Sequence, residues 1–278
     1  MKHKKNLKPV RKNMFSCYVE KERFLGQPTK DLADFVACKK GSLRKTLILS
    51  LASLLESVDH INDFDCFRAS GKLDEFLRML ELSKEDSITL KFLILAFFEK
   101  HSENSSGIEI PQDDVISLRK GRLFEEILYR IGPVKRGDVD LLSMHCQPML
   151  NREVLEIKCG RDTVTGKNLD VVFWGKDYIE GYECKSCVNY FIDLGKSHAE
   201  KGKKVREKIR YLNQLAKTLK NYFKEVHIIL ASFSPEEDLK RQIPLLRQWV
   251  SECDGDSTLY FKVMGIEKII DCIDKKSF

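Results

Sequence analysis

The stretch that most constrains the fold is residues 168–188, with the sequence NLDVVFWGKDYIEGYECKSCV. An apolar run rich in β-branched and aromatic residues leads into a turn at residues 175–181, and a second strand-like segment returns from it. This pattern is typical of a β-hairpin. Asp170 lies on the first strand, and Glu183 and Lys185 lie on the second. Because side chains alternate along a strand, Glu183 and Lys185 project from the same face.

Charged groups are costly in so apolar a hairpin. A twisted hairpin brings Asp170 beside Glu183 and Lys185, and two carboxylates with one ammonium destabilise an apolar sheet unless a cation or a ligand compensates them. The pattern therefore predicts a metal site. A plainer interpretation stays open: Glu183 and Lys185 form a cross-strand pair on an exposed face, and Asp170 only caps the turn after Gly166.

The spacing of these residues resembles that of a known family. Asp170, followed thirteen residues later by Glu183-Cys184-Lys185, is similar to the D…(D/E)xK motif of the PD-(D/E)XK, or restriction-like, nucleases, although Leu169 stands where the family name has proline. The resemblance covers roughly residues 118–233. It implies an α/β fold with an αβββαβ core and a mixed sheet, and phosphodiester hydrolysis that depends on Mg²⁺, with Mn²⁺ as a substitute.

The resemblance also implies a role for each motif residue. Asp170 and Glu183 would bind Mg²⁺, and the backbone carbonyl of Cys184 would add a further ligand. Lys185 would orient or deprotonate the attacking water, helped by a pKa that burial and the metal lower. Carboxylate-bound divalent cations suit this reaction, since negative charge develops on the phosphoryl and leaving oxygens. One bound ion and two bound ions both stay open.

A helix is expected at residues 114–131, where apolar side chains recur at helical spacing until Gly132-Pro133 ends the pattern. In restriction-like nucleases the helix before the first core strand often presents a glutamate to the metal, and the resemblance assigns that role to Glu125. Glu126 points about 100° away around the helix, so the two cannot both be ligands. The alternative for either glutamate is a solvated face or an ion pair with a neighbouring arginine.

The segments that follow complete the expected core. In order, we expect a first strand at 154–159, the hairpin, a basic helix, a buried strand at 226–233, a helix that Pro244 kinks or divides, a strand at 258–264 and a helix at 266–273. Ser234 is the expected N-cap of the helix that contains Pro244. This order agrees with the αβββαβ pattern.

The expected basic helix has a cationic face. Residues 196–224 contain eight lysines and two arginines against two glutamates, whereas the whole chain has a formal net charge of only +6. Most charged helical faces are simply solvated, but such faces usually mix both signs, and a basic segment on a near-neutral chain indicates a polyanionic partner. The predicted nucleic-acid contacts are Lys203, Arg206, Arg210, Lys217, Lys220 and Lys224.

The chain of 278 residues is long enough for two domains. We expect a helical N-terminal domain of unknown role at 1–110, with helices at 42–58, 72–82 and 85–101, and the nuclease-like domain at 111–278. The first thirteen residues carry six lysines and arginines and no acid. They form either a solvated tail or an arm that follows a phosphate backbone.

The nine cysteines are scattered without a framework, which favours a reducing interior and a cytoplasmic protein. We expect no membrane span and no signal peptide. Cys184 and Cys187 form a CxxC, and some relatives hold an iron–sulfur cluster, but an extended strand places the two sulfurs on opposite faces. Small buried hydrophobic residues are the preferred interpretation. His145 and His198 have no partner at ligand spacing and are not predicted to be ligands.

The predicted function is therefore a Mg²⁺-dependent endonuclease acting on DNA in restriction, phage defence or repair. Since relatives often dimerise to cut both strands, the resemblance also implies a homodimer. One alternative is a catalytically inactive nucleic-acid-binding module with the same fold, against which the intact Asp170, Glu183 and Lys185 set argues. Another is a ribonuclease that uses the same site, although no aromatic stacking platform is evident.

Overall fold

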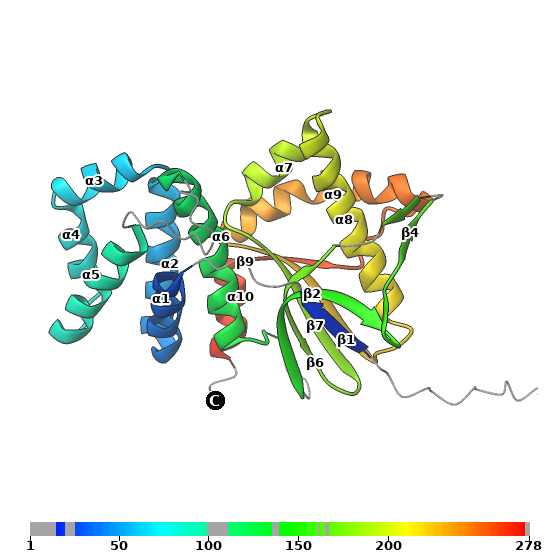
Figure 1. Cartoon of the computed structure of the whole chain (residues 1–278), viewed down its shortest axis with the longest axis horizontal. Helices are drawn as coiled ribbons and strands as arrows, with labels where there is room; N and C mark the ends of the chain where they lie inside the picture. Colours follow the sequence, from blue (N-terminus) through cyan, green and yellow to red (C-terminus); the bar gives the residue numbers. More distant parts are fainter. Residues whose placement is uncertain are drawn as a thin grey trace, which may run out of the picture.

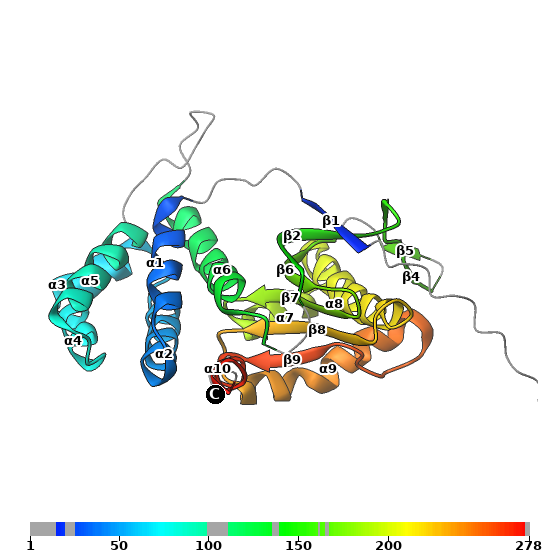
Figure 2. The ribbon, with the colours of Figure 1, turned by 90° about the horizontal axis from the view of Figure 1, so that it is seen from below.

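A computed structural model describes residues 15–19, 26–98, 111–134, 139–160, 162–164 and 167–275. The chain is an α/β protein in which a helical N-terminal region, α1 to α6, is followed by a mixed β-sheet with interleaved helices (Figure 1). Seen from below, α6 stands between the other N-terminal helices and the strands (Figure 2). In the described part of the chain, no helix combines the length and apolar character that crossing a membrane requires.

The first five helices are α1 (Gln27–Cys38), α2 (Gly41–Ser57), α3 (Ile61–Ala69), α4 (Lys72–Met79) and α5 (Lys84–Phe98). The predicted helices at 42–58, 72–82 and 85–101 correspond to α2, α4 and α5, although residues 99–101 lie outside the described residues. The predictions did not include α1 and α3. Phe64 is the one buried residue of α3, so that its sequence shows no apolar stripe.

One hydrophobic core joins this helical region to the sheet. Helix α6 (Gln112–Ile131) contributes Phe124, whose ring lies 4.3 Å from that of Phe233, the residue after strand β8 (Glu225–Ser232). The same core contains Val171 and Tyr182 from the sheet and Leu51 from α2. As predicted, α6 ends before Gly132-Pro133. Glu125 is thus carried by a helix that packs on both α1 and the strands.

The main sheet has the strand order β1-β2-β6-β7-β8-β9, with β3 as a short addition to β2. The pairs β1–β2, β2–β6 and β6–β7 are antiparallel, and β7–β8 and β8–β9 are parallel. The strands are β1 (Phe15–Val19), β2 (Leu141–Leu150), β3 (Glu153–Val154), β6 (Leu169–Trp174), β7 (Tyr178–Lys185), β8 (Glu225–Ser232) and β9 (Lys262–Gly265). The predicted hairpin is confirmed as β6 and β7.

The sheet separates two hydrophobic cores. Val171 and Phe173 of β6 lie in the core shared with α6 and α10 (Ile266–Asp274), whereas Val172 and Trp174 lie in a second core. Helices α8 (Glu200–Leu219) and α9 (Glu236–Asp254) cover the second core, together with α7 (Val188–Lys196) (Figure 2). The succession α6, β2, β6, β7, α8, β8 gives the expected αβββαβ order, with α7 inserted before α8.

The predicted first strand was wrong. The first core strand is β2, whereas the predicted segment 154–159 contains the end of β3 and the short strand β4 (Ile157–Cys159). Among the described residues, strand β4 pairs only with β5 (Asp162–Val164), in a separate two-stranded sheet. Pro148 lies inside β2 and obscures its alternating pattern, because proline is uncommon within paired strands.

The C-terminal part differs from expectation in details. Helix α9 is one helix that contains Pro244, rather than two short helices. Pro235 is its N-cap residue in place of Ser234, whose hydroxyl oxygen accepts a hydrogen bond from the Val188 amide 3.1 Å away. The last strand, β9, begins at Lys262, four residues later than predicted.

Two disulfides contradict the interpretation of the cysteines as buried thiols. Cys17 binds Cys146 across β1 and β2, and Cys159 binds Cys253. The paired residues are 129 and 94 positions apart, so their spacing in the sequence carried no signal. Cys184 and Cys187 are free, and Cys184 is buried as expected. Structural disulfides are more common in oxidising compartments, which weakens the cytoplasmic assignment.

Candidate metal centre

Glu125 projects from the middle of α6 toward the sheet. Its side chain is 14% exposed and accepts a hydrogen bond from Arg122 Nη1, 2.8 Å from Oε2. The pKa of Glu125 is raised to about 8, chiefly by burial and next by the nearby Asp170 carboxylate, although the Arg122 guanidinium opposes the shift. Part of its negative charge is therefore uncompensated.

Asp170 is the second residue of β6 and faces Glu125. Its Oδ2 accepts a hydrogen bond from the Cys184 amide of β7 at 2.6 Å. Burial, followed by repulsion from Glu183, raises the pKa of Asp170 to about 6. Two carboxyl groups with raised pKa values therefore face each other, and a cation between them would favour their ionised forms and oppose both shifts.

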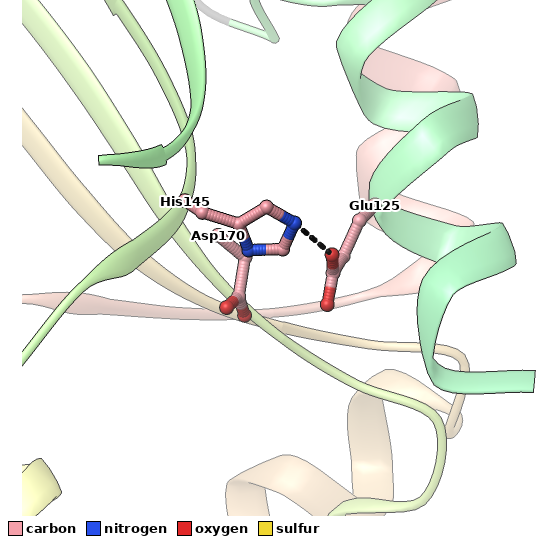
Figure 3. A group of neighbouring side chains, drawn as sticks. All are labelled: Glu125, His145 and Asp170. Carbon is pink, nitrogen blue, oxygen red and sulfur yellow. Dashed lines mark ion pairs between the residues drawn. The ribbon is translucent and has the colours of Figure 1, made fainter. Parts of the chain in front are cut away.

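His145 of β2 completes the group. Glu125, His145 and Asp170 each offer one ligand atom, and the three atoms lie within 4.8 Å of one another (Figure 3). His145 Nε2 is 3.7 Å from Glu125 Oε2. The three residues come from a helix and two adjacent strands. We refer to Glu125, His145 and Asp170 as the acidic–histidine triad.

The backbone of β2 is unusual at His145. Its φ is +50°, a conformation that is uncommon for residues other than glycine. The β2–β6 register runs through Met144↔Val171 and resumes at Cys146↔Leu169, so it passes over the facing positions His145 and Asp170. Irregular strand geometry often re-aims side chains beside functional sites. Here the irregular geometry occurs where the side chains of His145 and Asp170 point toward α6.

Glu183 lies beside the triad but is bound by cations from its own chain. Lys185 Nζ is 2.7 Å from Glu183 Oε1, and Lys208 Nζ of α8 is 2.6 Å from Oε2. The contact between Lys208 and Glu183 is an ion pair whose angles do not meet those of a hydrogen bond. Burial alone would raise the pKa of Glu183, but the two ammonium groups outweigh it and hold the pKa below its usual value. Glu183 is therefore already neutralised.

The pKa of Lys185 does not shift in the expected direction. Burial would lower its pKa, yet attraction to Glu183 and Asp170 is stronger, so the pKa is raised above the ordinary value rather than lowered. Its Nζ also donates a hydrogen bond to the Cys184 carbonyl oxygen at 3.0 Å. The carbonyl oxygen that was predicted to be a metal ligand thus accepts a hydrogen bond from the Lys185 ammonium group.

The choice between the two glutamates of α6 follows from their partners. Glu126 Oε1 is 3.2 Å from Arg122 Nε, and its Oε2 is 2.5 Å from Arg130 Nη1. Glu126 therefore forms intrahelical ion pairs with neighbouring arginines, which is the alternative interpretation given for the two glutamates. Only Glu125 belongs to the triad.

The cations of α8 mainly contact their own chain. Arg206 donates to the carbonyl oxygens of Gly195 and Ser197, and Arg210 donates to the carbonyl oxygen of Trp249 at 3.1 Å. Lys203 is 71% exposed and lies 3.9 Å from Glu207. Lys217 lies 3.2 Å from Asp254. Lys220 and Lys224 follow the end of α8 at Leu219 and have partners as well: Lys220 lies over the Tyr260 ring at 5.0 Å, and Lys224 is 2.8 Å from Asp177.

His145 is the member of the triad that the sequence did not indicate. It was not predicted to be a ligand because no residue at ligand spacing accompanies it, and the two residues that the structure brings beside it lie 20 residues before it and 25 residues after it in the chain. A signal existed in the alternation of Leu142, Met144, Cys146 and Leu150, which indicates a strand that contains His145 but not its pairing with β6.

No model of a known protein family, no curated protein and no solved structure matches the chain.

Proposed function

We propose that the chain is a metal-dependent endonuclease that hydrolyses phosphodiester bonds of DNA, in restriction, phage defence or repair. The observation that carries the proposal is the convergence of Glu125, His145 and Asp170 beside the cation of Lys185. The αβββαβ order and the spacing from Asp170 to Glu183 and Lys185 support a relation to the PD-(D/E)XK nucleases.

The triad fits a divalent cation by its chemistry. Two carboxylates and one imidazole are common ligands. Burial, followed by repulsion from a neighbouring carboxylate, raises the pKa values of Glu125 and Asp170, and a bound cation would offset both effects. Mg²⁺ prefers oxygen ligands, whereas imidazole nitrogen suits softer ions. We therefore expect Mn²⁺ to bind at least as well as Mg²⁺. Glu183 is paired with two lysines, so the proposed ligand set contains His145 in its place.

When bound, the ion would stabilise negative charge on the phosphoryl oxygens. In hydrolysis, a bond forms between the water oxygen and phosphorus, the ester P–O bond breaks, and a proton passes to the leaving oxygen. Lys185 is protonated, because its pKa is raised. Its ammonium can donate a hydrogen bond to a phosphoryl oxygen or to the attacking water, whereas a role as general base would require a lower pKa.

A cleavage assay tests the proposal. Supercoiled plasmid is incubated with Mg²⁺ or Mn²⁺ and the wild-type protein, Asp170→Asn, Glu125→Gln or, as a control, the exposed Glu237→Gln of α9. We expect the wild type and the control to cut the plasmid, and the two triad variants to leave it intact. Equal cutting by all four proteins would point to a contaminant, and no cutting by the wild type would overturn the proposal for this substrate.

The inactive nucleic-acid-binding module remains the second candidate, because Lys185 and Lys208 neutralise Glu183 and the Cys184 carbonyl is engaged by Lys185. It predicts that DNA is bound but never cut, with equal affinity for the wild type and Asp170→Asn. Matched single- and double-stranded DNA and RNA substrates in the same assay separate both candidates from a ribonuclease.

The cationic face of α8 is the proposed DNA contact. Exposed ion pairs contribute only about 0–1 kcal/mol, so phosphates can replace the acidic partners of its lysines. Lys203→Ala with Lys220→Ala should weaken DNA binding and lower its salt dependence. Arg210→Ala should instead lower stability, because Arg210 binds the end of α9. DNA affinity that the double variant leaves unchanged would exclude this face.

Two further proposals concern the setting of the enzyme. A homodimer would allow both strands to be cut, and its mass in solution by light scattering decides the point.

We propose the cytoplasm as the compartment, where DNA is present, although the two disulfides argue for an oxidising one. Thiol labelling of the protein in fresh cell extract, read at Cys17 and Cys159 by mass spectrometry, distinguishes the two, since these cysteines react only when the disulfides are absent, whereas the exposed Cys38 and Cys66 react in both cases.

A further inference from the structure

A cavity borders the triad on the side of β2. It has a volume of about 410 Å³ and lies between α1, the C-terminal half of α6 and the first half of β2. His145 forms part of its wall, so the cavity opens beside the position proposed for the metal ion. Sites for small ligands generally measure about 300–1,000 Å³, so the space is sufficient for one nucleotide.

Cations line one part of this cavity. Lys30 comes from α1 and Arg130 from α6. Arg130 binds Asp34 through Nε and Glu126 through Nη1, and within the described residues its Nη2 has no hydrogen-bond partner. Glu126 also borders the cavity, but its two carboxylate oxygens pair with Arg122 and Arg130. The lining is therefore suited to an anion.

Apolar and aromatic side chains form another part of the wall. Tyr129 of α6 faces the cavity together with Leu142 and Met144 of β2. Leu142 is 42% exposed, which leaves apolar surface for a ligand to cover. Ser143 adds a hydroxyl between them. An aromatic ring and aliphatic side chains next to cations match a nucleotide, which joins a flat base to a phosphate.

We propose that this cavity binds one nucleotide of the substrate, with its phosphate toward Lys30 and Arg130 and its base against Tyr129 and Leu142. The inference rests on the proposed nuclease function, and it identifies the segment of the nucleic acid that lies next to the scissile phosphate. The cavity then sets the position of the nucleic-acid strand relative to the triad, while α8 supplies phosphate contacts farther along the nucleic acid.

Calorimetry with deoxyadenosine monophosphate and with inorganic phosphate, in the presence of Mn²⁺, tests the proposal. The proteins are the wild type, Lys30→Ala, Tyr129→Ala and the exposed Lys240→Ala of α9 as a matched control. Lys30→Ala should weaken nucleotide binding about tenfold, since a charged hydrogen bond is lost. Tyr129→Ala should weaken it about threefold or more by removing the stacking ring. Lys240→Ala should have no effect.

Binding of Mn²⁺ alone separates this inference from the proposed function. All four proteins should bind Mn²⁺ equally, because none of these residues belongs to the triad. If Mn²⁺ fails to bind the wild type, the metal proposal fails. If Mn²⁺ binds but the nucleotide does not, the cavity proposal is overturned. Phosphate that binds as tightly as the nucleotide, or a Tyr129→Ala variant that binds like the wild type, would show an anion site that does not hold a base.

Discussion

His145 and Asp170 face each other across β2 and β6 at the point where both strands change the face they present. Met144 packs against the core shared with α6, whereas Cys146, two residues later, lies in the second core. On β6, Leu169 lies in the second core and Val171 in the first. Residues two apart on a regular strand share a face, so the alternation breaks in both strands. The break lies at the two residues that meet Glu125.

The first prediction concerns metal binding. His145→Asn should weaken Mn²⁺ binding at least tenfold with little change in metal-free stability, because asparagine tolerates a positive φ but lacks the imidazole. Asp170→Asn should weaken binding further, since it removes a charged ligand. Titration calorimetry measures the affinities, and Glu237→Gln serves as the control. Wild-type affinity in His145→Asn would remove the histidine from the site.

The second prediction concerns pH. The pKa values of about 8 for Glu125 and about 6 for Asp170 lie above the ordinary 4.5 and 3.8. A carboxyl with a raised pKa stabilises the folded state below the ordinary pKa, and this contribution is lost as the pH rises through the folded value. The free energy of unfolding of the metal-free protein should therefore fall between about pH 5 and pH 8.

Urea denaturation at several pH values, in the presence of a chelator, measures this slope. Glu125→Gln should flatten it, since glutamine does not titrate. Glu183, whose pKa is lowered, acts in the opposite direction and only below its ordinary value of 4.5, outside this range. Added Mn²⁺ should reverse the fall, because it binds the deprotonated ligands. If Glu125→Gln leaves the slope unchanged, Glu125 does not have the raised pKa on which the prediction depends.

The third prediction concerns Glu183. Glu183→Gln leaves Lys185 and Lys208 without their shared anion, and removing one partner of a buried ion pair usually lowers stability by about 3–5 kcal/mol. Glu207→Gln is the matched control on α8, where a half-exposed pair with Lys167 is worth about 1 kcal/mol or less. Both values come from urea denaturation at neutral pH. Equal losses would show that Glu183 has no special structural role.

The fourth prediction concerns the disulfide next to the triad. Cys17→Ser should lower the free energy of unfolding by about 2–4 kcal/mol, as is usual for a lost disulfide. It should also weaken Mn²⁺ binding, because Cys146 follows His145 and the bond ties β2 to β1. Cys253→Ser, which breaks the other disulfide, should lower stability without affecting Mn²⁺ affinity. Equal metal affinity in both variants would separate the disulfide from the triad.

Local pattern determined much of the fold. The hairpin of β6 and β7, the helices α2 and α6 and the strand β8 follow from apolar periodicity and from the turn and capping residues around them, which act over a few residues. Asp170 was indicated by its place in the apolar hairpin, whereas Glu125 was indicated by the resemblance to restriction-like nucleases. The spacing also indicated Lys185, which lies beside Asp170 as expected.

Tertiary structure alone decided which groups meet. His145 joins Glu125 and Asp170 because β2 pairs with β6 and turns at a positive φ, and no local pattern encodes that pairing. Lys208 reaches Glu183 from α8, 25 residues further along the chain, and the disulfides join residues about a hundred positions apart. Protonation also depends on these long-range contacts, since burial and neighbouring charges set the pKa of each carboxyl. The sequence by itself determined the elements with a clear apolar period, and packing between distant elements determined the site.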